Sequence, residues 1–308
     1  MRTNHRFIRI LVPLVVLFMV AMSTSHLVSS AEAQTDEERF QQLPADQQKL
    51  AQRMLTFMSD MEKKYFARVS ALNGNSESET KKIPSDYSDY DLKVTRGPVV
   101  EKFGQMLATG KKASPKSRMP GNLVWGRFYS LDAHPRSPLV GMLHATIVVQ
   151  FFDSGQSFAG GWLGIMPGTR IEGDLNQLKQ SVDSIFAKHN ISPDYYRNLI
   201  CKGDPKEIDR KWRRKPACVG VSFYGRPAFQ LTEKNFDLVT ETFVGFVDVY
   251  MGLVEKHKDS PYTEKDVMAQ DKMRREWLLD QLFSDPYASE IVPFEAWSLA
   301  NVPPIIKF

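Results

Sequence analysis

Residues 144–152 read HATIVVQFF, and this run decides the fold class. Successive side chains of a strand point to opposite faces, so one face would carry Ala145, Ile147, Val149 and Phe151, and the other Thr146, Val148, Gln150 and Phe152. Gln150 is the only strongly polar side chain among them, which is typical of a strand covered on both faces. We therefore expect a strand inside a sheet, with other elements packed against both of its faces.

Helices are predicted on either side of this strand along the chain. Apolar residues at three- and four-residue spacings predict a helix from about Pro44 to Leu72, with Gly74 beyond its end. Similar patterns predict three later helices, near residues 175–190, 236–258 and 264–282.

Two further segments, 123–131 and 219–223, are patterned as strands. The polar, unpatterned segments 76–91 and 111–121 are predicted to be loops. Helices followed by strands and then by helices indicate an α+β domain on a largely antiparallel sheet.

Residues 1–33 have the order of a secretory signal peptide. Three arginines precede an apolar run of 13 residues, and a small polar segment ends in Ala31-Glu32-Ala33. This run is shorter than the roughly 18 residues of a membrane-spanning helix. We therefore expect a cleaved leader, a mature chain of a single domain over residues 34–308, no membrane span after cleavage, and a periplasmic or secreted location.

The net charge and the cysteines of the chain bear on its expected partners and on a possible disulfide. The leader holds three arginines and one glutamate, so its removal lowers the net charge from +4 to +2. The chain has no basic tail, and nucleic acid is not an expected partner. Cys201 and Cys218 are the only cysteines. Either they form a disulfide, which would contribute about 3 kcal/mol, or they are two buried free thiols.

The histidines are few, and two of them lie close together. Of six in the chain, His5 and His26 belong to the leader, so His134 and His144 are half of those that remain. Both fall in the window 129–167, which continues through the strand to a Gly-Gly pair expected to form a turn. This concentration makes the window the first place to look for chemistry.

Five segments, in order, match the motifs of one enzyme family. They are 97–104 (GPVVEKFG), 130–135 (SLDAHP), 144–145 (HA), 160–167 (GGWLGIMP) and 247–258 (VDVYMGLVEKHK). Together they resemble the Gly-x-Val-Phe-Glu-Lys-x-Gly segment, the serine-bearing strand with its His-Pro turn, the second histidine, the Gly-rich turn and the Asp-Ala-Tyr helix of the oxygen-dependent coproporphyrinogen III oxidases.

The resemblance implies a fold, a reaction and a set of partners. The family fold is a large, rather flat antiparallel sheet flanked by helices on both sides, usually paired into a homodimer. The family reaction is oxidative decarboxylation of two propionates on a reduced tetrapyrrole, with dioxygen as co-substrate and no organic cofactor. A tetrapyrrole or a similar flat small molecule is therefore the expected ligand.

The resemblance also assigns roles to residues of the window. His144 would be the catalytic proton donor, a task suited to a side chain whose ordinary pKa is near 6.5. His134 would support it, or the two histidines would bind a metal. Substrate contacts would come from Ser130, Thr146, Gly160 and Gly161. The alternative for His144 is a hydrogen-bonded histidine at the start of a strand.

One departure from the family pattern opens further interpretations. The family has Asn-x-Arg just after its second histidine, and here those positions are Thr146 and Val148. Cations from elsewhere could replace the arginine, or they are solvated surface charges: Arg127, Arg136, Lys211, Arg213 and Arg214. A second hypothesis is therefore a non-catalytic exported haem- or porphyrin-binding protein, with His134 or His144 as axial ligand. A third is an interaction protein that uses the sheet as a dimerising scaffold.

Overall fold

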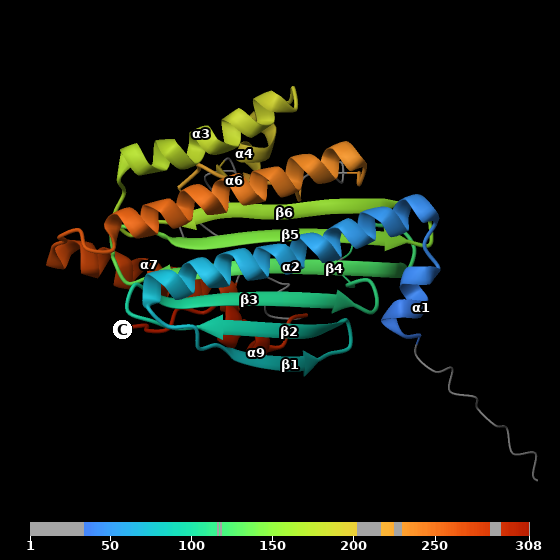
Figure 1. Ribbon diagram of the computed structural model, residues 1–308, viewed down its shortest axis with the longest axis horizontal. Coiled ribbons are helices and arrows are strands. Elements are labelled where there is room, and N and C mark those ends of the chain that lie inside the picture. Colours follow the sequence, from blue (N-terminus) through green and yellow to red (C-terminus); the bar gives the residue numbers. More distant parts are fainter. Residues whose placement is uncertain are drawn as a thin grey trace, which may run out of the picture. The chain divides into compact units, whose positions relative to one another are not determined.

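Strands that are neighbours in the sequence pair with one another throughout the sheet. The computed structural model describes residues 34–115, 117, 119–201, 217–224, 230–283 and 291–307, apart from the side chains of 280–283. Within this part of the chain, one seven-stranded antiparallel sheet has the order β1-β2-β3-β4-β5-β6-β7 (Figure 1). The strands are β1 (Glu79–Pro84), β2 (Ser88–Thr95), β3 (Val100–Gly110), β4 (Leu123–Pro135), β5 (Met142–Phe152), β6 (Ser157–Met166) and β7 (Val221–Ser222).

Helices precede and follow the strands, as the sequence predicts. They are α1 (Asp36–Gln41), α2 (Ala45–Asn73), α3 (Glu172–Lys188), α4 (Asp194–Cys201), α6 (Glu233–His257), α7 (Glu264–Phe283) and α9 (Phe294–Ala300). α2 begins after Pro44 and ends where Gly74 adopts the left-handed φ of 69°, a conformation that glycine adopts without strain. The predicted boundaries of this helix are confirmed to within a residue.

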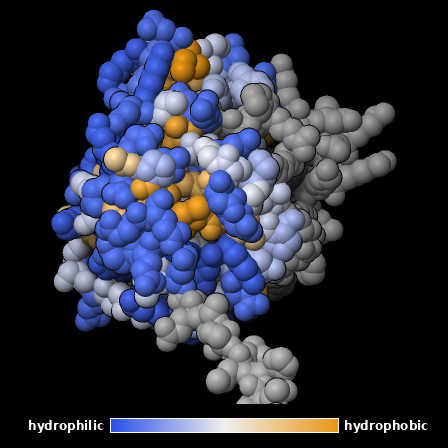
Figure 2. Space-filling view, turned by 90° about the vertical axis from the view of Figure 1, so that its right-hand side faces the viewer, coloured by the Kyte–Doolittle hydropathy of each residue, from blue (hydrophilic) through white to orange (hydrophobic). Residues whose placement is uncertain are grey.

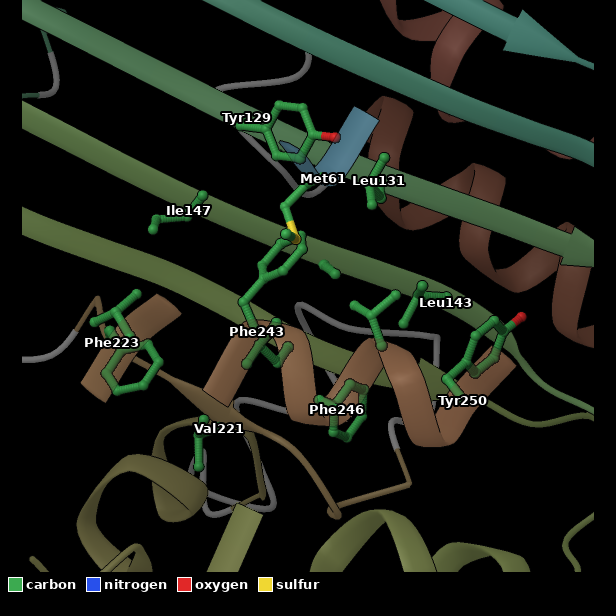
Figure 3. Packing of buried hydrophobic residues seen from close by; sticks show 14 of the residues in the cluster. Met61, Tyr129, Leu131, Leu143, Ile147, Val221, Phe223, Phe243, Phe246 and Tyr250 are labelled. Atoms are coloured by element: carbon green, nitrogen blue, oxygen red, sulfur yellow. The ribbon is translucent and has the colours of Figure 1, made fainter. Parts of the chain in front are cut away.

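The larger hydrophobic core lies on the face of the sheet that α2 and α6 cover, here called the first face. Tyr129 and Ile147 from the strands pack there beside Met61 of α2 and Phe243 of α6 (Figure 3). Fully burying a side chain of this size contributes about 1.5–3 kcal/mol, so this face supplies much of the driving force for folding.

A smaller core lies on the opposite face, here called the second face. Met106 and Met142 pack there with Trp277 of α7 and Trp297 of α9. The two indole rings stack with their centroids 5.4 Å apart. Both faces of the sheet therefore carry helices, and the predicted α+β fold with an antiparallel sheet is confirmed.

The predicted loop at 76–91 is wrong, because this segment contains β1 and the start of β2. Ile83 is the only buried side chain of β1, and the rest of the strand is exposed. Backbone pairing with β2 holds this edge strand in place, so its sequence needs no apolar alternation. The polar residues that suggested a loop are those of a sheet edge.

The predicted Gly-Gly turn is also wrong. Gly160 and Gly161 lie inside β6, opposite Val148 and Ile147 of β5. A Cβ atom on Gly160 would come within 2.5 Å of the Phe158 ring, and one on Gly161 would overlap the carbonyl oxygen of Thr146. Close packing, and not a change of chain direction, is the reason for glycine here.

The structure joins Cys201, at the end of α4, to Cys218 by a disulfide with its Cα atoms 5.5 Å apart.

The predicted leader over residues 1–33 lies outside the described residues, as do Lys211, Arg213 and Arg214. Among the helices that the structure describes, none has the length and apolar character needed to cross a bilayer. The end of the molecule seen in Figure 2 is mainly hydrophilic, with small apolar patches between polar residues.

Candidate functional site

His144 and Asp132 form a pair on the second face of the sheet. They are cross-strand partners on β5 and β4, and the imidazole Nδ1 lies 2.7 Å from the Asp132 carboxylate. The carboxylate is completely buried, whereas the His144 side chain is 19% exposed. Because an ionised carboxylate only accepts hydrogen bonds, the proton of the neutral imidazole lies on Nδ1, and Nε2 keeps its lone pair. The ring can therefore accept or return a proton at Nε2.

Asn301, just after α9, connects this pair to the other histidine. Its side-chain amide donates to the second oxygen of Asp132, and its backbone carbonyl accepts a hydrogen bond from His134 Nε2 at 2.8 Å. Lys102 on β3 donates to the carbonyls of Ser298 and Val302. Polar side chains on the second face thus hold the end of α9 against the strands that carry the histidines.

His134 lies deeper than His144 and has different surroundings. Burial lowers the pKa of its ring well below 6.5, and the positive charges of Lys102 and Arg274 lower it further. The ring is neutral, and because a carbonyl only accepts, its proton lies on Nε2. Its Nδ1 is buried and has no hydrogen-bond partner in the described part of the chain, and the ring meets Trp277 edge-on at 6.1 Å. These contacts give His134 a packing role beneath α7 and α9.

A metal at the two histidines stays a prediction. Among the described residues, no group of three or more His, Cys, Asp and Glu side chains is arranged to hold a metal ion. His134 Nε2 is engaged by Asn301, and His144 Nδ1 by Asp132. Each ring therefore has one nitrogen in use by the protein itself.

Ser130 and Thr146 are cross-strand partners next to the Asp132–His144 pair. Both are buried. Among the residues that the structure describes, the Ser130 hydroxyl has no hydrogen-bond partner, which costs about 1–3 kcal/mol for a buried polar group. Thr146 accepts a hydrogen bond at its hydroxyl from the backbone amide of Trp162, 2.9 Å away. The two predicted substrate contacts thus lie beside His144, and Thr146 also helps to pair β5 with β6.

β6 places aromatic rings and glycines alternately on the second face. Trp162 lies opposite Thr146, and Gly164 lies opposite His144. A Cβ atom on Gly164 would come within 3.0 Å of the Trp162 indole nitrogen, so this ring folds back over the strand beside His144. Gly160 lies on the same face under the rings of Phe158 and Tyr224.

The structure brings five predicted residues, His134 among them, to one face and places a sixth elsewhere. Ser130, His144, Thr146 and Gly160 alternate onto the second face, whereas Gly161 lies at a first-face position. Gly161 thus contributes to the site through close backbone packing against β5.

The structure describes two of the five predicted replacement cations, Arg127 and Arg136, and neither lies at a second-face strand position of β4–β7. Arg127 lies at a first-face position of β4, where it pairs with Asp36 and its guanidinium lies 4.5 Å from the centre of the Trp125 ring. Arg136 is exposed in the turn that follows β4. Val148 lies on the second face between Phe128 and Gly160. In β4–β7, the described second-face positions contain neither lysine nor arginine.

Sequence reasoning missed Asp132, Trp162 and Asn301. Asp132 lies within the quoted SLDAHP motif, and a hairpin centred near Pro138 would have placed it opposite His144. Trp162 lies within the GGWLGIMP motif, but the resemblance assigns no role to its side chain. No pattern in the sequence connects Asn301 with the window, because 169 residues separate it from Asp132.

Comparison with known proteins gives a partial similarity. The chain is 31% identical over 144 residues to a protein named oxygen-dependent coproporphyrinogen-III oxidase from Francisella philomiragia. The matched part covers 44% of this chain and 44% of that protein. The chain thus matches less than half the length of this curated relative. No protein-family model matches the chain.

Proposed function

We propose that this chain is a coproporphyrinogen III oxidase-like protein that binds a tetrapyrrole over the second face of β4–β6 and decarboxylates its propionates oxidatively. The observation that carries the proposal is the Asp132–His144 pair, with its 2.7 Å hydrogen bond and a partly exposed imidazole. The partial similarity to the Francisella philomiragia protein supports the same class of reaction.

His144 is the acid–base group in this proposal. The buried carboxylate of Asp132 orients the ring through Nδ1 and directs Nε2 away from itself. Asn301 and Lys102 act indirectly, because they hold the segment that caps Asp132. The chain's own residues thus supply one oriented proton carrier.

The co-substrate, the oligomeric state and the location of the protein are parts of the same proposal. Dioxygen is the co-substrate, and no organic cofactor takes part. The protein acts outside the cytoplasm after removal of residues 1–33, as the leader pattern predicts. It acts as a homodimer, as the family resemblance implies.

A non-catalytic porphyrin-binding protein is the second candidate, and Val148 is the observation that favours it. An apolar side chain at this second-face position offers no bidentate partner for a carboxylate. If haem is the ligand, His144 fits as an axial ligand because its ring is partly exposed. His134 does not fit, since its ring is buried and its Nε2 bonds to Asn301.

Turnover and binding assays on the same preparation test the proposal. Reduced coproporphyrinogen III is supplied with dioxygen, and products are separated by chromatography after oxidation to porphyrins. Wild type is expected to form the vinyl products, and His144→Asn to lose about 100-fold or more of the rate, which is typical for loss of a general acid–base group.

His189→Asn is the matched control and is expected to keep the wild-type rate. His189 is also a half-buried histidine paired with a carboxylate, Glu241, but it lies where α3 packs on α6. A folded wild-type protein that neither turns over nor binds any tetrapyrrole would refute the proposal. A haem absorbance shift that disappears in His144→Ala, without turnover, would establish the second candidate instead.

A further inference from the structure

Three aromatic side chains form a surface on the second face, and the resemblance to the oxidase family assigns a role to none of them. We call Phe158, Trp162 and Tyr224 the aromatic platform. Phe158 and Trp162 are half-buried, and Tyr224 is 42% exposed. The rings of Phe158 and Tyr224 lie 6.2 Å apart and are tilted by 33°.

The platform rings fold back over the sheet because β6 has glycines between them. Gly160 leaves room for the rings of Phe158 and Tyr224, and Gly164 leaves room for the edge of Trp162. Rings that lie over a glycine cover its backbone, which stabilises a strand. Covering the strand does not require the outer side of the rings to be exposed. In this protein the outer side nevertheless stays partly exposed.

The platform adjoins the candidate catalytic group. Trp162 lies next to Gly164 on β6, and Gly164 is the cross-strand partner of His144. A flat ring stacked on Trp162 would therefore present its edge to the imidazole. Aromatic contacts of this kind add to affinity beyond the effect of the buried area.

The described strand positions around the platform offer no cation for an alternative means of binding. At the described second-face positions of β4–β7, Asp132 is the only charged side chain besides the histidines, and its carboxylate is completely buried. A ligand held by its carboxylates would need lysine or arginine partners here. Stacking is the interaction that the described side chains provide.

We infer that the aromatic platform holds the ligand by stacking on the faces of its pyrrole rings, so that affinity depends on stacking and not on the number of carboxylates. This inference rests on the proposed function and names how the same site selects its ligand. Propionates other than the one at His144 would lie at the edge of the ring, without a paired cation from the described positions of β4–β7.

Fluorescence titration with two porphyrins tests the inference. The probes are deuteroporphyrin IX, which has two carboxylates, and coproporphyrin III, which has four. The two affinities are expected to agree within about threefold, and to change less than about threefold between about 0.05 and 0.5 M salt, since screening acts on charge pairs. Tyr224→Ala and Trp162→Ala are each expected to weaken both porphyrins about tenfold, equal to about 1.4 kcal/mol.

Tyr262→Ala is the matched control, because Tyr262 is a similarly exposed tyrosine, at 48%, outside the platform. It should leave both affinities unchanged. Tight binding that is salt-dependent, stronger for coproporphyrin III, or insensitive to Tyr224→Ala would overturn the inference and leave the proposed function standing. Failure of wild type to bind either porphyrin would overturn the inference, and only together with absence of coproporphyrinogen turnover would it overturn the proposed function as well. If Tyr224→Ala dissociates a dimer and leaves porphyrin affinity unchanged, the platform is an interface between copies of this chain, and the inference is wrong.

Discussion

Replacing Lys102 by methionine tests how the sheet holds the end of α9. Burial lowers the pKa of this amine from 10.5 to about 8, with a further contribution from the positive charge of Arg96. Each tenfold change in proton affinity corresponds to about 1.4 kcal/mol, so the charged amine costs the folded state about 3 kcal/mol. Hydrogen bonds to the carbonyls of Ser298 and Val302 offset part of this cost.

The direction of the pH dependence follows from these values. Between pH 8 and 10.5 the unfolded chain binds more protons at Lys102 than the folded chain does. Stability therefore rises with pH in this window, by about 2 kcal/mol between about pH 7 and pH 10, and is flat below it as far as this group is concerned. Lys102→Met removes the titrating amine. The difference in unfolding free energy between this variant and wild type should therefore change by about 2 kcal/mol between about pH 7 and pH 10.

Urea unfolding followed by tryptophan fluorescence at several pH values measures this difference. Lys82→Met is the control, because Lys82 has a side chain that is 88% exposed on edge strand β1. It should run parallel to wild type across the window. Parallel curves for Lys102→Met and wild type would refute the reasoning, since they would mean that the amine is not desolvated by folding.

Three further changes have expected outcomes in the same unfolding assay. The double variant Cys201→Ser/Cys218→Ser should lose about 3 kcal/mol of stability, the loop-closure value for a separation of 17 residues, and reductant should affect wild type alone. Tyr250→Phe should lose about 1 kcal/mol, because its buried hydroxyl donates to two backbone carbonyls; no loss would mean that they find other donors. Asn301→Ala should lose about 2 kcal/mol, because the buried carboxylate of Asp132 loses a donor; Asn301→Gln retaining full stability would contradict a requirement for this geometry.

The elements that could be predicted are those whose side chains are buried in a regular pattern. α2 buries Met54, Met58 and Tyr65 at helical spacings, and its sequence shows that spacing directly. β5 buries side chains on both faces, as its two apolar faces predict. The hairpin β1–β2 could not be predicted in the same way, because backbone hydrogen bonds at a sheet edge leave no apolar pattern in the sequence.

The candidate site was only partly predictable. The family motifs located His144 and Ser130, and the structure places both on one face. The role of Asp132 depends on the register of the β4–β5 hairpin, and a slip of one residue would have put it on the opposite face. Asn301 comes from the packing of α9, and tertiary packing between distant segments is not encoded in any local spacing.

The bond between Asn301 and Asp132 has a consequence for synthesis of the chain. β1 to β6 pair with their sequence neighbours, so each hairpin can form soon after its second strand leaves the ribosome. The Asp132 carboxylate and the His134 ring can form their hydrogen bonds only after Asn301 has been synthesised, 169 and 167 positions later in the chain. A nascent chain that stalls before Asn301 therefore displays an uncovered acid and an uncovered histidine in the middle of its sheet. Incomplete chains therefore differ from complete ones at the strands that carry the candidate site, because their Asp132 and His134 side chains are uncovered.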